Sequence, residues 1–327
     1  MQKQKRMNRD CLRLDTEWQP HHGSSDVWQT QGVLRDEAGV GYGFRMSVHR
    51  VRAGLESFCV INSALHHFAS GKTSAGRWSI HHLDGEKDNL FIDADSIIFS
   101  DSAHLMLEKD ALALRLRGAG FGLDLRMART LPEVWFGEDG RMPLPTLGRR
   151  LKSLYNCALP GLSCVGRVYL ADGSSNRVRG TASCERLWGA VPLRLAKTHW
   201  ERFYLFLDYG DEISLTTFPY AGQYAALCMP RGVPPFALYD YLLEAVDFLE
   251  IDEWRFASAW RLSLPQYSHT TYYLSPLSEQ FRLPAAHPVL GVYDADGMRL
   301  GYAFSELLPG ARNEIDRIGL AMFFTET

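Results

Sequence analysis

The sequence consists largely of short segments in which apolar and polar residues alternate, separated by residues that favour tight turns. In residues 43–50, for example, Phe44, Met46 and Val48 alternate with polar side chains. A period of two places the apolar side chains on one face of a β-strand, as in a half-buried sheet. The chain is therefore predicted to be an all-β protein of antiparallel strands, arranged as a sandwich or a barrel.

Turn residues indicate how neighbouring strands connect. The alternating runs at residues 111–117 and 121–127 flank a glycine-containing segment and are predicted to pair. Asp172-Gly173, Tyr209-Gly210-Asp211 and Asp296-Gly297 supply residues that tolerate positive φ, so each predicts a hairpin. The hairpin at residues 209–211 joins two strands, predicted at residues 200–207 and 212–218.

One segment departs from this pattern. Residues 234–249 begin with Pro-Pro and carry apolar side chains at helical spacing, which predicts one substantial helix. The apolar stripe comprises Phe236, Leu238, Tyr241, Leu242, Ala245, Phe248 and Leu249. Such a stripe covers a sheet more often than it binds a ligand.

The chain length and composition limit the class of protein. At 327 residues the chain exceeds a usual single core, so two domains are expected, at residues 1–195 and 196–327. A net charge of −3 without long blocks of either sign argues against a nucleic-acid surface. We find no apolar run that fits a secretion signal or a membrane span, and expect a soluble, cytoplasmic protein without an integral membrane segment.

The six cysteines are scattered and lack CxxC spacing. In an intracellular protein this pattern favours free, buried thiols over a disulfide framework or a zinc site. Cys157 and Cys164 are the pair that could come close enough to be bridged.

Residues 180–189 place an acid, a guanidinium and an indole on one predicted strand. Glu185 shares its face with Ser183 and Leu187, whereas Arg186 and Trp188 lie on the opposite face. Beside apolar neighbours, a carboxyl group has a raised pKa and becomes a plausible proton donor. The alternative is that Glu185 forms an ordinary ion pair with an arginine at the surface.

Other motifs give weaker signals. The adjacent histidines at 21–22, 66–67 and 81–82 invite a metal site, but neighbouring residues on a strand point to opposite faces. We expect no metal and no organic cofactor, with His67 or His66 as a polar group lining a pocket. Neither a phosphate loop nor a Gly-x-Ser-x-Gly elbow is present.

Several blocks in order along the chain resemble the AttH-like, carotenoid 1,2-hydratase family. They begin at Val27-Trp28 and Gly32-Val-Leu, continue through Gly137-Glu-Asp-Gly140 and Tyr155-Asn156, and close at Gly301-Tyr-Ala-Phe-Ser-Glu306-Leu307. The family's Gly-x-x-Trp-x-Asp-Arg-Glu-Trp pattern is matched only in part. Gly180, Arg186 and Trp188 agree, while Ser183, Glu185 and Leu187 replace the family's Trp, Asp and Glu.

The resemblance implies two lipocalin-like β-barrels in tandem, with a ligand site between them and chemistry on hydrophobic, unsaturated molecules. Loss of one strand carboxylate to Leu187 weakens the machinery for hydrating an alkene. A cycloaddition, as in the architecturally related lipocalin-like Diels–Alderases, needs mainly an apolar cavity that holds a polyene folded. We therefore expect a cofactor-independent intramolecular cyclase of specialised (secondary) metabolism.

Two alternatives to this cyclase stay open. One is a hydratase (a lyase) or a proton-initiated terpenoid cyclase, and the other is a non-catalytic lipocalin-type carrier. In each case the expected partner is a hydrophobic small molecule, such as a polyene, terpenoid or polyketide.

The site residues follow from the strand pattern and the resemblance together. Glu185 is expected to act as the acid or hydrogen-bond donor, with Tyr155 and Asn156 as polar orienters. Substrate-binding residues are predicted to be Trp188, Trp200, Arg186, His67, Ser183, Leu187 and Glu306, the last being the second candidate acid.

Overall fold

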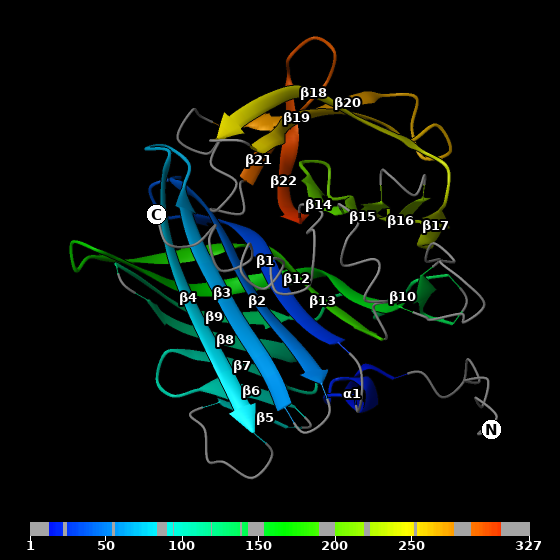
Figure 1. Ribbon diagram of the computed structural model, residues 1–327. Coiled ribbons are helices and arrows are strands. Elements are labelled where there is room, and N and C mark those ends of the chain that lie inside the picture. The colour runs from blue at the N-terminus through cyan, green and yellow to red at the C-terminus, as the bar shows by residue number, and fades with distance from the viewer. Residues whose placement is uncertain are drawn as a thin grey trace, which may run out of the picture.

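The computed structural model describes most of the chain. It covers residues 13–21, 25–53, 56–83, 90–93, 95–118, 120–137, 139–142, 154–189, 200–218, 223–251, 254–277 and 289–308. These residues form two curved antiparallel sheets, which Figure 1 shows one above the other. The prediction of an all-β fold is confirmed. The predicted domain boundary at residue 195 lies outside the described residues.

The N-terminal sheet has the strand order β4-β3-β2-β1-β13-β12-β9-β8-β7-β6-β5, and β10 and β11 also pair with β12. Its strands are β1 (Ser25–Asp36), β2 (Gly41–Ala53), β3 (Glu56–His67), β4 (Lys72–Leu83), β5 (Leu90–Ile92), β6 (Ser96–Phe99), β7 (Ala103–Leu107), β8 (Ala111–Gly118), β9 (Phe121–Ala128), β10 (Val134–Trp135), β11 (Arg141–Met142), β12 (Leu154–Leu170) and β13 (Ser175–Gly189).

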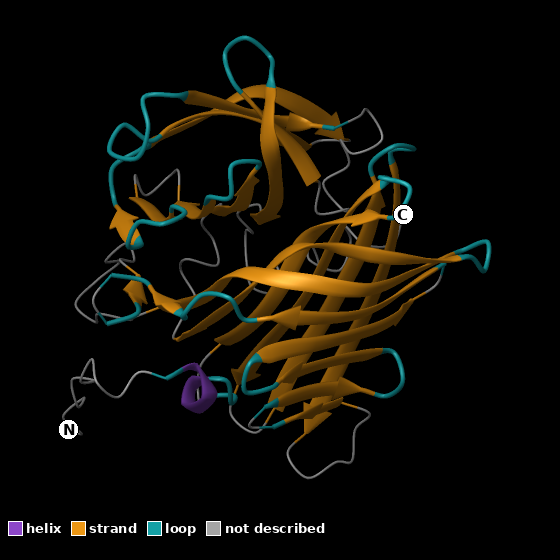
Figure 2. Cartoon of the chain, turned by 180° about the vertical axis from the view of Figure 1, so that it is seen from behind, coloured by secondary structure: helices purple, strands orange, loops and turns teal. Residues whose placement is uncertain are grey.

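The C-terminal sheet has the strand order β17-β16-β15-β14-β22-β21-β20-β19-β18. Its strands are β14 (Trp200–Leu207), β15 (Glu212–Phe218), β16 (Gln223–Met229), β17 (Phe236–Leu238), β18 (Leu242–Ile251), β19 (Trp254–Ser263), β20 (Thr271–Pro276), β21 (Val289–Tyr293) and β22 (Arg299–Leu308). Seen from behind in Figure 2, the short helix α1 (Leu14–Glu17) lies beside the N-terminal sheet.

The turns form where the sequence predicts them. β8 pairs with β9, and the hairpins at Gly173, Gly210 and Gly297 connect β12 with β13, β14 with β15, and β21 with β22. Each of these three glycines has a φ between 80° and 95°, a conformation that residues with a Cβ atom rarely adopt.

The predicted helix at residues 234–249 is wrong, because this segment forms β17 and β18. The register with β19 shifts around Asp247, and the irregularity interrupts the period of two. Leu242, Ala245 and Phe248 stand three positions apart in the sequence, a spacing that resembles a helix. Hydrogen bonding to β19 over the whole strand then decides the conformation, a contribution that local spacing does not contain.

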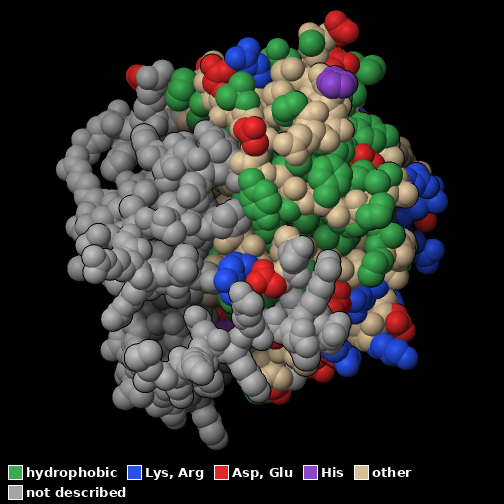
Figure 3. All heavy atoms as spheres, turned by 90° about the vertical axis from the view of Figure 1, so that its right-hand side faces the viewer, with side chains coloured by type: hydrophobic (Ala, Val, Ile, Leu, Met, Phe, Trp, Pro, Cys, Tyr) green, Lys and Arg blue, Asp and Glu red, His purple; other side chains and the backbone are tan. Residues whose placement is uncertain are grey.

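Many apolar side chains of this segment are exposed rather than packed in a core. Tyr239, Leu242, Val246 and Phe248 are all at least two-fifths exposed, as is Val233 just before the segment. Figure 3 shows hydrophobic side chains gathered on a face of the molecule at the height where Figure 1 draws the C-terminal sheet.

Three apolar clusters stabilise the fold. One fills the inside of the N-terminal sheet, a second fills the inside of the C-terminal sheet, and the third contains residues of both. In β14, Phe203 and Leu205 belong to the second cluster, while Tyr204 and Phe206 belong to the third. The outer face of β14 is thus buried against the N-terminal sheet, which explains why this strand is apolar on both faces.

The five described cysteines, at positions 59, 157, 164, 184 and 228, are buried free thiols, as expected. No helix among the described residues is long and apolar enough to cross a membrane.

Candidate functional site

Glu185 is buried between the two sheets. Its side chain lies on the outer face of β13, and the residue is 1% exposed. Oε1 accepts hydrogen bonds from Ser214 Oγ at 2.6 Å and Asn156 Nδ2 at 3.3 Å. Oε2 accepts from Arg202 at 3.3 Å and Gln31 Nε2 at 3.5 Å. Four donors from four strands therefore surround this carboxyl group, and Glu185 acts as an acceptor in a buried pair rather than as part of a surface ion pair.

A second buried acid, Glu306, adjoins Glu185 through a shared arginine. Arg202 donates to Glu306 Oε2 at 3.0 Å, and Arg45 of the other sheet donates to the same oxygen at 3.2 Å. Arg45 also donates to Gln29 Oε1 at 2.9 Å. His49 Nε2 lies 3.5 Å from the second oxygen of Glu306. Two carboxyl groups and two guanidinium groups thus form one continuous cluster across the junction between the sheets.

A third buried acid, Glu212, lies beside this cluster. Its carboxyl group accepts a hydrogen bond from the Tyr204 hydroxyl and another from the Gly161 backbone N–H at 2.8 Å. Burial raises the pKa of Glu212 to about 7, and the negative charge of Glu185 adds to the rise. Burial and the adjacent Glu212 charge also raise the pKa of Tyr204 well above its ordinary value.

We call this set the interface network. It consists of Gln29, Gln31, Arg45, Asn156, Ser183, Glu185, Arg202, Tyr204, Glu212, Ser214 and Glu306. Its two arginines balance two of its three acids. A third buried negative charge would have no cation of the network to neutralise it, and this agrees with the raised pKa of Glu212.

The strand register explains how the sequence builds the network. Gln29 and Gln31 stand two residues apart on β1 and pair with Glu185 and Ser183 of β13, so all four share one face. Arg202 of β14 stands opposite Glu306 of β22 in the same way.

The opposite face of β13 carries a different charged group, which we call the Arg186 cluster: Arg186, Asp26, His21, Trp28 and Trp188. Arg186 donates to Asp26 Oδ1 at 2.5 Å, and its guanidinium lies 4.1 Å from the Trp28 ring centroid. His21 stacks on Trp188 with centroids 5.1 Å apart.

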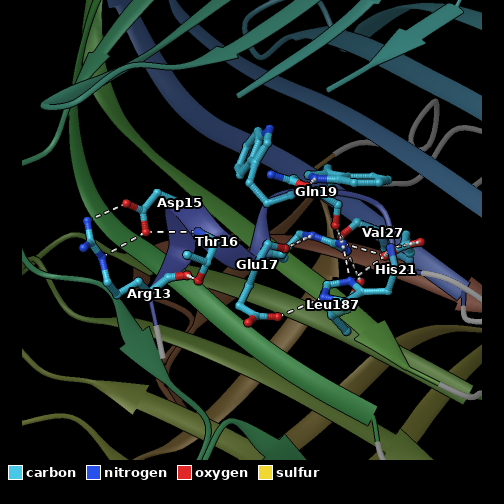
Figure 4. A network of polar contacts seen from close by, with 12 residues as sticks. Arg13, Asp15, Thr16, Glu17, Gln19, His21, Val27 and Leu187 are labelled. Carbon is cyan, nitrogen blue, oxygen red and sulfur yellow. Dashed lines mark hydrogen bonds and ion pairs between the residues drawn. The ribbon is translucent and has the colours of Figure 1, made fainter. Parts of the chain in front are cut away.

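Backbone groups complete this cluster. Arg186 also donates to the carbonyl oxygens of Gln19 at 2.9 Å and Leu187 at 2.6 Å. Figure 4 shows Gln19, His21 and Leu187 close together, to one side of Glu17. Burial alone would raise the pKa of Asp26, but the hydrogen bond from His21 and the Arg186 charge outweigh it and lower the pKa. Arg186 is thus held by partners within the N-terminal sheet and α1.

Four of the predicted site residues come together in the interface network: Glu185, Asn156, Ser183 and Glu306. Leu187 is buried nearby in the apolar cluster shared by both sheets. Arg202, rather than Arg186, is the ion-pair partner of Glu185.

The remaining predicted residues lie elsewhere. Tyr155 points away from the network and stacks on Trp188, with centroids 5.5 Å apart, beside the Arg186 cluster. His67 bonds to Ser70 in the turn after β3. Trp200 pairs through its backbone with Leu308, and its side chain lies outside the described ones.

The sequence reasoning missed Gln29, Gln31, Arg45, Arg202, Tyr204, Glu212 and Ser214. A charged residue within an otherwise apolar strand is the sequence signal that could have indicated these buried polar residues. Arg45 lies between Phe44 and Met46, yet it is only 2% exposed.

No group of three potential metal ligands occurs among the residues that the structure describes. His66 is buried, and burial together with the Arg45 charge lowers its pKa to about 3. Its Nδ1 lies 2.9 Å from Thr73 Oγ1. The imidazole is therefore neutral near neutral pH and belongs to the core.

Two solved structures share this fold over nearly their whole length. The structure of an AttH protein from Nitrosomonas europaea aligns with a TM-score of 0.77 and 16% identity, over 92% of this chain and 97% of that one. Kievitone hydratase from Nectria haematococca aligns with a TM-score of 0.62 and 14% identity, over 89% of this chain and 91% of that one.

A weaker alignment, with a TM-score of 0.44 and 12% identity, relates the chain to CghA with bound Sch210972. No protein-family model and no curated protein sequence matches the chain. The AttH-like resemblance predicted from the sequence motifs is thus confirmed at the level of the fold.

Proposed function

We propose that the chain is an enzyme that protonates a carbon–carbon double bond of a hydrophobic small molecule at the interface network. The observation that carries this proposal is the Tyr204–Glu212 pair, a buried carboxyl group with a pKa of about 7 bonded to a phenol. A general acid works best when its pKa lies near the working pH, because it is then both protonated and able to release its proton.

The network supplies the groups that such a reaction requires. The Tyr204–Glu212 pair donates a proton to one alkene carbon, which leaves the other carbon electron-deficient. The Glu185 carboxyl group, held by four donors, faces the developing positive charge. In a hydration, water adds to the electron-deficient carbon through its oxygen, and its surplus proton passes to Glu185. In a proton-initiated cyclisation, a second double bond adds instead and a proton is lost at the end.

Two further observations support this proposal. The apolar cluster shared by the sheets adjoins the network, which suits a hydrophobic substrate. A structure of similar fold is named as a hydratase. Within the proposal, Asn156 and Ser214 orient Glu185, and Arg202 and Arg45 keep the charge balanced.

The cycloaddition expected from the sequence is the second candidate. The specific observation in its favour is the number of strong donors, Arg202, Arg45 and Tyr204, that could polarise a carbonyl of a folded polyene. The two candidates differ in whether a solvent proton enters the product.

The experiment uses this difference. The protein is incubated in D₂O with a panel of linear polyenes, prenylated aromatics and terpenoid alcohols, and mass spectrometry detects products that gained water or isomerised. We expect one carbon-bound deuterium per product. Glu212→Gln and Tyr204→Phe should each reduce the rate by about 10²–10⁴-fold, the usual range for a general acid.

The matched control is Tyr209→Phe, which removes a phenol from a hydrogen-bonded group of the C-terminal sheet and should leave the rate unchanged. Products without carbon-bound deuterium, formed at full rate by Glu212→Gln, would replace the proposal with the cycloaddition. Stoichiometric binding of panel members without any product would indicate a carrier.

A further inference from the structure

Four exposed arginines form two directly opposed pairs near the turns that end β1, β12 and β13. Arg35 of β1 pairs in register with Arg179 of β13, and Arg177 of β13 pairs with Arg167 of β12. Like charges in directly opposite positions of an antiparallel sheet destabilise it. Two such pairs side by side therefore concentrate positive charge on a protein whose net charge is −3.

Three of these guanidinium groups have no hydrogen-bonding or ion-pair partner within the part of the chain that the structure describes. Among the described residues, Arg35, Arg177 and Arg179 make no hydrogen bond or ion pair, whereas Arg167 donates to Ser175. A surface pocket of about 290 Å³ lies between them, lined by Arg35, Asp36, Glu37, Arg177, Val178 and Arg179.

The two acids beside the pocket neutralise this charge only in part. One carboxylate oxygen of Asp36 accepts from the backbone N–H groups of Ala38 at 3.0 Å and Val40 at 2.9 Å, and the other accepts from the Tyr42 hydroxyl. The Asp36 carboxylate is thus held by its own hairpin. Glu37 is exposed in the turn. The pocket therefore keeps an excess of guanidinium donors.

The pocket lies in line with the interface network. Arg179, Thr181, Ser183 and Glu185 alternate along the same face of β13, so Arg179 is about 20 Å from Glu185 at ~3.3 Å per residue. Along this face the burial changes from complete at Ser183 to exposed at Thr181. The arginines stand where the buried face reaches the surface.

Apolar side chains lie beside this face. Val33 stands two residues before Arg35 on the same face of β1. Phe68 stacks on Tyr302 with centroids 4.6 Å apart, and Val33 packs in the same cluster. An apolar surface thus adjoins the charged pocket on the side of the C-terminal sheet.

We propose that Arg35, Arg177 and Arg179 form a binding site for a phosphate group. Guanidinium forks match phosphate oxygens in geometry and charge, and an anion would relieve the repulsion between the opposed arginines. The group is either the head of an amphipathic ligand whose apolar part extends toward Glu185, or the headgroup of a lipid in a bilayer. The first of these identities rests on the proposed function, but the phosphate site itself does not.

The test measures binding of inorganic phosphate to the full chain by calorimetry at low ionic strength. We expect a single site whose affinity falls about tenfold or more in Arg35→Gln/Arg179→Gln, since each removed fork takes away charge-assisted hydrogen bonds. The matched control is Arg231→Gln, which changes an exposed arginine in the turn between β16 and β17 and should bind as the unmodified protein does. Equal binding by the double variant and the unmodified protein would overturn the proposal.

Two further arms separate the sources of the phosphate. Dodecyl phosphate that binds at least tenfold more tightly than both inorganic phosphate and dodecanol would support the head of an amphipathic ligand. Sedimentation with phosphatidic acid vesicles, but not with phosphatidylcholine vesicles, would support a lipid headgroup. Whichever binding is observed, to dodecyl phosphate or to the vesicles, must be lost in the Arg35→Gln/Arg179→Gln variant. These assays measure no turnover. The phosphate proposal can therefore fail while the protonation experiment succeeds, and the phosphate proposal can hold while the protonation experiment fails.

Discussion

The two faces of β13 bury charge in different ways. On one face, Arg186 is enclosed by Asp26, two indole rings and backbone carbonyls that come from the N-terminal sheet and the segment beside α1. On the other face, Glu185 depends on Arg202 and Ser214 of the C-terminal sheet. The Arg186 cluster can therefore form when the N-terminal sheet folds, whereas the interface network exists only when both sheets are in contact.

The charge balance of the two clusters also differs. Asp26 has a lowered pKa, as expected for a carboxylate that stabilises the fold by pairing with a cation. Glu212 has a raised pKa and a position beside two paired acids, which costs stability when it ionises. Groups held at such a cost are frequent in functional sites. This difference supports a structural role for the Arg186 face and the proposed chemical role for the Glu185 face.

The largest expected effect is that of Arg186→Met. Removing Arg186 leaves Asp26 with Arg50 as its remaining arginine partner, at 3.1 Å. The carbonyl oxygens of Gln19 and Leu187 lose their donor, and the cation–π contact with Trp28 is also lost. We expect the free energy of unfolding to fall by about 3–5 kcal/mol, measured by urea denaturation.

The control for this variant is Arg117→Met, whose partly exposed pair with Asp124 should contribute no more than about 1 kcal/mol. A similar small loss in both variants would mean that the Arg186 cluster contributes little to the fold, and the structural assignment of that face would be wrong.

The next effect concerns the pH dependence of stability in Glu212→Gln. With a pKa of about 7 in the folded protein and 4.5 as the ordinary value, Glu212 is protonated in the folded chain and ionised in the unfolded chain between these limits. The folded state then binds more protons, so its stability falls as pH rises from about 4.5 to 7 and stays level above. Relative to Glu212→Gln, the unmodified protein should lose about 3 kcal/mol over this range.

Asp26→Asn is the matched opposite. The lowered pKa of Asp26 gives stability that is present above its unfolded pKa and lost as pH falls through its folded pKa. For each variant, urea denaturation at several pH values gives the difference in free energy of unfolding between the unmodified protein and the variant. This difference should change with pH in opposite directions for Glu212→Gln and Asp26→Asn. Changes in the same direction would remove the electrostatic distinction between the two faces.

Much of the fold can be predicted from local pattern, because alternation and turn chemistry are local properties. The strands at 111–117 and 121–127 and the hairpins at Gly173, Gly210 and Gly297 all follow from residues close together in sequence. The helix predicted over 234–249 failed because the apolar residues of this irregular strand also match helical spacing, and only the pairing with β19 reveals a strand.

The site could be predicted only in part, for a reason of geometry. The strand pattern correctly separates Glu185 from Arg186, since adjacent side chains point to opposite faces. It also gives Arg45 an outward position, which suggests solvent. In a protein with two packed sheets, the outward face of one sheet is the inner face of the junction, so Arg45 is buried against Glu306. The pairing of residues 261 positions apart is not contained in local sequence.

Tyr155 provides the smallest and most discriminating prediction. The sequence places it beside Asn156 in the candidate site, but in β12 the two side chains point to opposite faces, and Tyr155 stacks on Trp188. Tyr155→Leu should therefore lower the free energy of unfolding by about 1 kcal/mol, the usual value of an aromatic pair, without changing the rate of the proposed reaction. Asn156→Leu removes a donor to Glu185 and should reduce that rate. Measured with the product assay, a rate loss in Tyr155→Leu as large as that in Asn156→Leu would show that the chemistry extends to both faces of β13.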